Sequence, residues 1–158
     1  GKRITLSTVG FPDKIRKLAN LTMRTRLAIS LNAPTDEKRN QLMPINKKRP
    51  LKALLEAVKY YTKRTKRRVT FEYVLINGFN DSQKDALELA KLVRGIPCKI
   101  NLIPYNLVPG LPYEKPPVGR IVAFRDYLLP RCPAVTLRKS KGEDIQAACG
   151  QLRTSLES

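Results

Sequence analysis

The sequence RVTFEYVLINGFND, residues 68–81, decides the fold of this chain. Its first part, from Val69 to Ile76, is rich in apolar and β-favouring residues and predicts a strand. Asn77-Gly78 and then Asn80-Asp81-Ser82 form a polar turn and a helix cap directly after that strand. The stretch therefore predicts a unit in which a strand turns directly into a helix.

The same succession of strand and helix extends in both directions from this stretch. Further strands are predicted at 4–8, 27–31, 99–104 and 134–137. Helices are predicted at 13–20, from Thr35 onward, from Pro50 to Tyr61, at 86–93 and at 118–129. Residues 106–117 contain four prolines and predict an ordered surface loop.

A repeated strand-helix unit implies parallel strands joined by right-handed crossovers. Such a chain forms either a β/α barrel or a doubly wound sheet, and the residue pattern alone leaves both open. In either architecture the functional groups lie at the carboxyl ends of the strands. We therefore expect an α/β fold whose site lies at that edge of the sheet.

The predicted strand ends carry uncharged polar residues, which are Ser7, Thr8, Ser30, Asn32, Asn77, Asn80 and Asn106. As a set, they suit the ribose hydroxyls, adenine edge or amino-acid head group of a small molecule. Each one taken alone is also explained as a cap of the following helix. Glu72 and Asn101 interrupt apolar strands, so we expect them to be hydrogen-bonded inside the barrel or to face a site.

The net charge points to an anionic partner. The 158 residues include 31 Lys and Arg against 13 Asp and Glu, which gives a formal charge of +18. Such an excess causes self-repulsion, and nucleic acid is the first partner that it favours. A membrane partner is not expected, because the sequence has no long apolar run, amino-terminal signal pattern or lipidation motif.

Several kinds of site are excluded by composition. The chain has no histidine, which excludes histidine-based catalysis and histidine metal ligands. Its three cysteines, Cys98, Cys132 and Cys149, are widely spaced and form no CxxC pair, which indicates a reducing compartment and no zinc site. No glycine loop of the Rossmann or P-loop type follows any predicted strand.

Cys149 lies in RKSKGEDIQAACGQL, residues 138–152, with Ala147, Ala148 and Gly150 beside it. These small neighbours would let a large planar partner approach the sulfur, and the upstream Arg138, Lys139 and Lys141 favour a thiolate and hold phosphates. A cysteine in a terminal helix is also explained as a small buried hydrophobic residue. The motifs that precede it decide between these interpretations.

Six segments in order resemble the radical SAM adenosine-carbon-2 RNA methyltransferases of the RlmN and Cfr type. They are ITLSTVG (4–10), LAISLNAP (27–34), LMPINKK (42–48), RVTFEYVLINGFND (68–81), PCKINLIPYN (97–106) and RKSKGEDIQAACGQL (138–152). The resemblance implies a partial radical SAM β/α barrel, of which this chain holds strands three to six and a carboxyl-terminal extension. Residues 1–130 would form the barrel part, and residues 131–158 the terminal strand and the methyl-carrier segment.

The resemblance also implies the chemistry and the site. The family methylates carbon 2 of adenosine in 23S rRNA and tRNA, using S-adenosylmethionine (SAM) and a 4Fe-4S cluster. Its SAM contacts correspond to Ser7, Ser30, Leu31, Asn32 and Asn106, and its methyl-carrying cysteine corresponds to Cys149. The family commonly has histidine at the position of Asn32. An enzyme of this kind is expected in the bacterial cytoplasm or in an organelle.

Parts of the family pattern are absent from this sequence. The CxxxCxxC loop that ligates the cluster, the resolving cysteine and the amino-terminal RNA-binding domain precede the matching segment in the family. We therefore expect a partial sequence that is inactive alone and needs the missing amino-terminal portion as its partner. We expect this chain to supply none of the residues that ligate the cluster.

Basic residues gather at three places in the sequence. They are the cluster Lys59, Lys63, Arg64, Lys66, Arg67 and Arg68, the turn Lys47-Lys48-Arg49, and Arg138, Lys139 and Lys141. Complementing a helix dipole explains two or three residues of the first cluster, and the other two groups fit an enzyme that binds rRNA and tRNA. An alternative from a different class is a non-catalytic basic RNA-binding module that retains a barrel remnant as a scaffold.

Overall fold

A computed structural model describes residues 4–21 and 25–138 of the chain. It contains a five-stranded parallel sheet of strands β1 (Ile4–Thr8), β2 (Thr25–Ser30), β3 (Val69–Leu75), β4 (Cys98–Pro104) and β5 (Val135–Leu137). The helices are α1 (Pro12–Ala19), α2 (Asp36–Leu42), the 3-10 helix η1 (Pro44–Lys47), α3 (Leu51–Thr65), α4 (Gln83–Leu92) and α5 (Val118–Leu128). The expected α/β class with a parallel sheet is confirmed.

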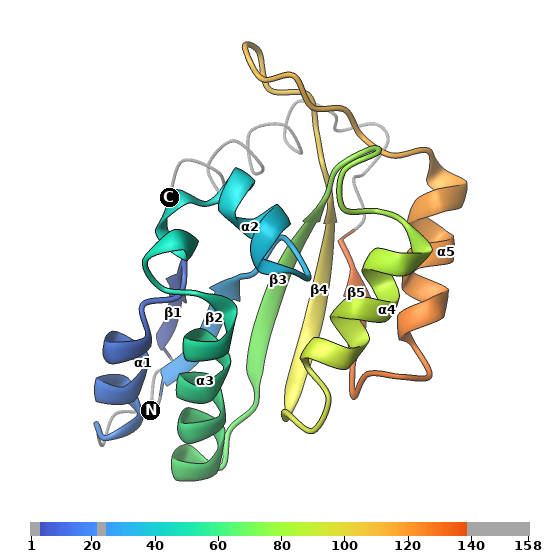
Figure 1. The fold of residues 1–158 in the computed structure, drawn as a ribbon. Coiled ribbons are helices and arrows are strands. Elements are labelled where there is room, and N and C mark those ends of the chain that lie inside the picture. The colour runs from blue at the N-terminus through green and yellow to red at the C-terminus, as the bar shows by residue number, and fades with distance from the viewer. Residues whose placement is uncertain (1–3, 22–24, 139–158) are drawn as a thin grey trace.

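The strand order distinguishes the two architectures that the residue pattern alone left open, and it favours the partial barrel that the resemblance implied. The strands lie side by side in chain order, β1-β2-β3-β4-β5. Within the described sheet, each new strand is therefore added at the same edge, and the strand order never reverses. The helices α1, α3, α4 and α5 lie on one side of it (Figure 1). A doubly wound sheet would reverse its order and place helices on both faces, whereas a β/α barrel winds in one direction. The described sheet is wound like part of a barrel.

The core lies between the sheet and these helices. Along β3 the side chains of Phe71 and Tyr73 are fully buried, and the Tyr73 ring stacks on Phe124 of α5 with centroids 5.4 Å apart. Leu54 and Val58 bury the matching face of α3. Each such side chain contributes roughly 1.5–3 kcal/mol when it is fully removed from water. This layer therefore fixes the strands and, with them, the edge where they end.

Two helices begin where the sequence predicts a cap. Thr35 precedes α2, and its side-chain oxygen accepts a hydrogen bond from the Lys38 amide at 3.3 Å. Ser82 and Asp85 form a reciprocal capping box at the start of α4. Lys38 also pairs with Asp85 at 2.6 Å, which joins the start of α2 to the start of α4. Both helices start just after the carboxyl end of a strand, so their caps hold the loops of that edge.

The sheet face away from the helices is polar. Because side chains alternate along a strand, Glu72 points away from the side that Phe71 and Tyr73 occupy. The register places Ser30, Glu72, Asn101 and Thr136 in one row across β2 to β5. The Thr136 hydroxyl lies 3.1 Å from the Asn101 side-chain oxygen, and Glu72 pairs with Arg138 at 3.8 Å. Glu72 and Asn101 thus lie on the sheet face away from the helices, where each has a polar partner and stays partly open to solvent.

Strand β1 forms one edge of the sheet and is incompletely covered. Its apolar side chains Ile4 and Leu6 are 45% and 42% exposed. Leu6 lines an open apolar cavity of about 520 Å³ together with Ile15, Leu18 and Leu27. Within the described residues, no further strand pairs with the outer edge of β1.

Candidate functional site at the carboxyl edge of the sheet

A cavity of about 520 Å³ lies where β2, β3 and β4 end. Its walls come from the strand ends, from the segment that joins α2 to η1 and from the loop after β4; they are formed by Val9, Ser30, Asn32, Leu42, Met43, Pro44, Ile45, Val74, Ile76, Tyr105, Leu111 and Tyr113. Most of these side chains are apolar, and a few polar groups converge among them. A cavity of this size and composition is typical of a site for a small molecule.

Arg39 of α2 holds one side of this cavity. The side chain is fully buried, and its guanidinium donates to the backbone oxygens of Leu31 (3.0 Å), Val9 (2.6 Å) and Ser30 (3.0 Å). It also donates to the Asn46 side chain at 2.9 Å. Burial lowers the pKa of Arg39 to about 10, and the carboxylate of Asp36 partly offsets this effect. One buried cation thus ties the ends of β1 and β2 to the segment that forms the cavity wall.

Asn32 and Asn80 hold the opposite side. Asn32 adopts a left-handed backbone conformation with φ of 60°, and its side-chain oxygen accepts a hydrogen bond from the Val74 amide at 3.0 Å. Asn80 is fully buried and donates to the backbone oxygens of Asn32 (2.8 Å) and Val74 (2.7 Å). Its own side-chain oxygen accepts from the Ile76 amide at 2.8 Å. For Asn80, the interpretation as a structural residue is therefore the one that the structure supports.

The residues predicted to contact a cofactor do not all lie in the cavity wall. Ser30 and Asn32 line it, and the Asn32 side-chain nitrogen faces the Met43 sulfur at 3.9 Å. Leu31 is buried in the core, and both its amide and its carbonyl are used in hydrogen bonds. Ser7, near the end of β1, is exposed and lines the apolar cavity beside α1. Asn106 is half-buried directly after the cavity residue Tyr105.

Tyr105 supplies a polar group that the sequence did not single out. Its hydroxyl is buried and has no hydrogen-bond partner among the described residues. Burial raises the pKa of this hydroxyl, and the nearby Val108 backbone partly offsets the rise. The Tyr113 ring meets the Tyr105 ring edge to face, with centroids 5.8 Å apart. A buried hydroxyl without a partner at a cavity wall is suited to bind a ligand.

The cavity fits one of the two expected cofactors. Ser30, Asn32 and Tyr105 provide polar contacts among apolar walls, an arrangement that suits the adenosine part of SAM. The described residues contain no group of three or more His, Cys, Asp or Glu that would hold a metal ion. They therefore do not supply a ligand set for a 4Fe-4S cluster.

Two of the three cysteines, Cys98 and Cys132, are described by the structure, and both are buried. Cys98 begins β4, at the opposite end of the strand from the cavity, and is 1% exposed. Burial raises the pKa of its thiol to about 12; nearby Cys132 raises it further and Arg68 lowers it. Cys132 is also buried, and its pKa is raised by burial. Cys149, the predicted methyl carrier, lies outside the described residues.

Known proteins place the chain in a family. The model of the radical SAM superfamily matches residues 1–90. The chain belongs to the radical SAM superfamily. This radical SAM chain is 54% identical, over 96% of its length, to a dual-specificity RNA methyltransferase RlmN of Anaeromyxobacter sp., and 48% identical, over 97%, to a probable one of Petrotoga mobilis. It spans 40% and 44% of the length of those two relatives.

Solved structures agree with this assignment. A radical SAM methyltransferase from Sphaerobacter thermophilus superposes with a TM-score of 0.87 at 48% identity, covering 94% of this chain and 43% of that one. A domain of the pyruvate-formate lyase-activating enzyme from Bacteroides vulgatus matches 87% of this chain and 80% of that one, with a TM-score of 0.65 at 14% identity, which shows the fold alone. The predicted resemblance of this radical SAM chain to the RlmN type is confirmed at the level of the family.

Proposed function

We propose that this chain is the carboxyl-terminal part of a radical SAM enzyme that methylates carbon 2 of adenosine in 23S rRNA and tRNA. In this proposal, the reaction passes through a methylated cysteine at position 149. The observation that carries it is the cavity at the carboxyl edge of the sheet, which joins the predicted contacts Ser30 and Asn32 to an unpartnered hydroxyl. The similarity to proteins named RlmN supports the RNA substrate.

The cavity residues would bind and orient SAM. When bound, SAM supplies the methyl group and the radical chemistry typical of the superfamily. The hydroxyls of Ser30 and Tyr105 and the Asn32 side-chain amide would hold its polar groups, while Met43 and Ile76 exclude water from the adenine ring. The cluster is proposed to be held by residues that precede this segment.

Cys149 would carry the methyl group between the donor and the RNA. As a thiolate its sulfur accepts the methyl group, and the small neighbours Ala147, Ala148 and Gly150 leave room for an adenine ring beside it. A cytoplasmic or organellar location follows from this proposed substrate. The described helices include none that is both long and apolar enough to span a membrane.

The test restores the missing portion of the enzyme. The segment that precedes the match in the Anaeromyxobacter relative is joined to this chain, the cluster is reconstituted without oxygen, and 23S rRNA and tRNA are supplied with SAM. We expect 2-methyladenosine in nuclease digests of the RNA, measured by liquid chromatography and mass spectrometry. We also expect S-methylcysteine in the peptide that contains Cys149.

Two variants provide the comparison. Cys149→Ala should abolish RNA methylation, whereas Cys132→Ala, which removes a buried thiol outside the cavity wall, should retain it. Methylation at carbon 8 in place of carbon 2 would contradict the proposed product. S-methylation of Cys98 or Cys132, or an active Cys149→Ala enzyme, would contradict the proposed carrier.

A further inference from the structure

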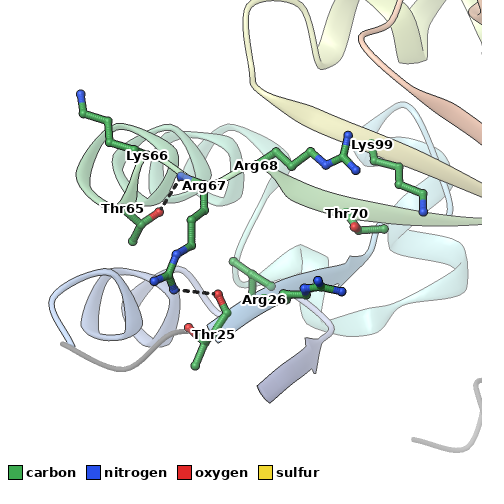
Figure 2. Close-up of a pocket in the computed structure, with 9 residues that line it drawn as sticks. Thr25, Arg26, Thr65, Lys66, Arg67, Arg68, Thr70 and Lys99 are labelled. Carbon is green, nitrogen blue, oxygen red and sulfur yellow. Dashed lines mark hydrogen bonds between the residues drawn. The ribbon is translucent and has the colours of Figure 1, made fainter. Parts of the chain in front are cut away.

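A second hollow, about 610 Å³ in volume, lies at the other end of the strands. We name it the basic hollow; its walls are Thr25, Arg26, Leu27, Thr65, Lys66, Arg67, Arg68, Thr70 and Lys99 (Figure 2). These residues come from the amino-terminal ends of β2, β3 and β4 and from the end of α3. From Thr70 to the end of β3, the strand rises by about 16 Å. The basic hollow is therefore separate from the cavity at the carboxyl edge.

Three of its cations converge on the inner face of the sheet. The register pairs Ala28 with Thr70 and Thr70 with Lys99. Arg26 precedes this row by two residues on β2, so strand alternation places it on the same face, and Arg68 lies one residue before β3. Figure 2 shows the side chains of Arg26, Arg68 and Lys99 around Thr70.

The dipole of α3 explains only some of this charge. Lys63 and Arg64 lie in the last turn of α3, where they stabilise the partial negative charge of its carbonyl groups. Arg26 and Lys99 belong to strands and do not lie in that turn. Arg67 is occupied in holding the Thr25 carbonyl at 3.2 Å. The strand cations need a different explanation.

No carboxylate among the described residues pairs with Arg26, Arg68 or Lys99. Glu72 lies on the same face, one row further along β3, and pairs with Arg138. Arg26 and Arg68 are exposed and Lys99 is half-buried, so their charged groups are open to a partner from solvent. Three cations in one open hollow favour an anion with several charged groups.

We propose that the basic hollow binds backbone phosphates of the substrate RNA, at nucleotides other than the one that reacts. This inference rests on the proposed function, because it takes RNA as the substrate. Arginine and lysine side chains bind phosphate oxygens, and arginine can do so with two parallel hydrogen bonds. The Thr70 hydroxyl adds a neutral donor between the cations. The open shape suits a polymer of repeated phosphates, which fixes the position of the RNA without selecting its sequence.

The experiment compares two variants of this chain that lose the same charge, at a protein concentration at which sedimentation velocity shows a monomer. The first, R26Q/R68Q/K99Q, removes the three cations of the basic hollow. The control, K84Q/K91Q/R94Q, removes three exposed cations on and just after α4, which have no ion-pair partner among the described residues. Binding to a fluorescein-labelled single-stranded RNA is measured by anisotropy over a range of salt concentrations, and circular dichroism confirms that each variant is folded.

We expect the hollow variant to bind this RNA about tenfold more weakly at low salt. The slope of log K against log salt should also fall in magnitude by about 2.1, the value for three fewer phosphate contacts on a single strand. The control should change both quantities much less. Equal losses in the two variants would overturn this inference and leave the proposed function intact, because net charge alone would then explain binding.

Two further outcomes separate the possible sources of the anion. Binding of inorganic phosphate to the wild-type chain but not to the hollow variant at constant ionic strength, with equal RNA affinity of the two proteins, would assign the hollow to a small anion and overturn the inference. A wild-type chain that binds no RNA would overturn both this inference and the use of RNA by this segment. Methylation by the restored enzyme, measured separately, distinguishes the second case from a failure of the chemistry.

Discussion

Buried polar side chains hold the cavity mainly through bonds to the backbone. Arg39 holds the carbonyl groups that end β1 and β2, while Asn80 holds those of Asn32 and Val74. Leaving one such buried group without its partner costs about 1–3 kcal/mol. The sequence identifies Asn32 and Asn80 because they follow strands. It does not identify Arg39, because Arg39 lies in the short polar helix DEKRNQL, which is typical of an exposed surface.

Tyr105→Phe tests whether the unpartnered hydroxyl serves a ligand. Removing a buried polar group that lacks a full hydrogen bond should raise the free energy of unfolding by about 1 kcal/mol. The same change should weaken SAM binding by the restored enzyme by roughly tenfold, since one hydrogen bond is lost. Urea unfolding and isothermal titration calorimetry measure the two effects.

Tyr60→Phe is the matched control for this change. It removes a hydroxyl that bonds the exposed Asn20 side chain far from the cavity, so both quantities should stay nearly constant. Unchanged SAM affinity in Tyr105→Phe would remove Tyr105 from the proposed site. A loss of stability would show that its hydroxyl has a structural partner.

The buried thiol of Cys98 should make the free energy of unfolding fall as the pH rises above 9. Burial raises the pKa of its thiol from 9.0 to about 12, so between these values the unfolded chain loses a proton that the folded chain keeps. The stabilising contribution is fully present below pH 9 and is lost as the pH rises toward 12, by up to about 1.4 kcal/mol per pH unit. Urea unfolding between pH 9 and 10.5 should therefore show a steeper decline for the wild type than for Cys98→Ala. Parallel declines would mean that Cys98 ionises freely in the folded chain.

Among the strands and helices, the agreement with the sequence is close where local signals decide the outcome. Strand β1 occupies its predicted range. Strands β3 and β4 each differ from their own predicted ranges by one residue at one end. Helix α5 ends one residue earlier than predicted. The 3-10 helix η1 was not predicted, because its proline and asparagine are equally typical of a turn. Side-chain periodicity and caps thus locate the long elements, while short irregular segments depend on what packs around them.

The exposed edge of β1 predicts self-association of the isolated chain. The outer edge of β1, with which no described strand pairs, carries exposed Ile4 and Leu6 and forms a template for pairing with a second molecule. We expect the chain to dimerise or aggregate through this edge, and Leu6→Lys to reduce that association in sedimentation velocity experiments. Leu107→Lys, which adds the same charge at a residue 67% exposed in the loop after β4, should have little effect. A monodisperse wild-type monomer at high concentration would contradict this expectation.

For the molecule as a whole, the sequence predicted the class of fold and a polar edge of the sheet, where the structure has a cavity. It did not predict the basic hollow, because Arg26, Arg68 and Lys99 are far apart in the chain and only the strand register brings them together. Its residue pattern alone left the barrel and the doubly wound sheet undistinguished, since both use the same strand-helix unit, and the resemblance of its motifs to a known family indicated the barrel. Long-range pairing is the information that local patterns lack.

The chain alone is expected to retain no stoichiometric iron-sulfur cluster. Thiolates fix such a cluster, and the two described cysteines are buried with raised pKa values. Anaerobic reconstitution followed by iron and sulfide analysis should give well below one cluster per chain. The chimera with the amino-terminal segment of the relative is the positive control. A full cluster on the isolated chain would show that the sequence pattern has been misinterpreted.

The rival interpretation, a non-catalytic RNA-binding module, makes a different prediction for the coding sequence. An in-frame CxxxCxxC motif upstream supports the enzyme, whereas a genuine start codon immediately before the codon of Gly1 supports the module. Both interpretations use the basic surface, but only the enzyme uses the cavity that Ser30, Asn32 and Tyr105 line. SAM binding by the restored protein therefore separates the two.

The consecutive strand order also determines how the sheet can assemble during synthesis. Each strand from β2 onward pairs with the strand made just before it, so pairing can follow the chain as it leaves the ribosome. Until β4 emerges, β3 has paired with β2 on one side only, and its other edge is free. A pause in translation between these two strands would therefore prolong the time during which the edge of an apolar strand is open to other nascent chains.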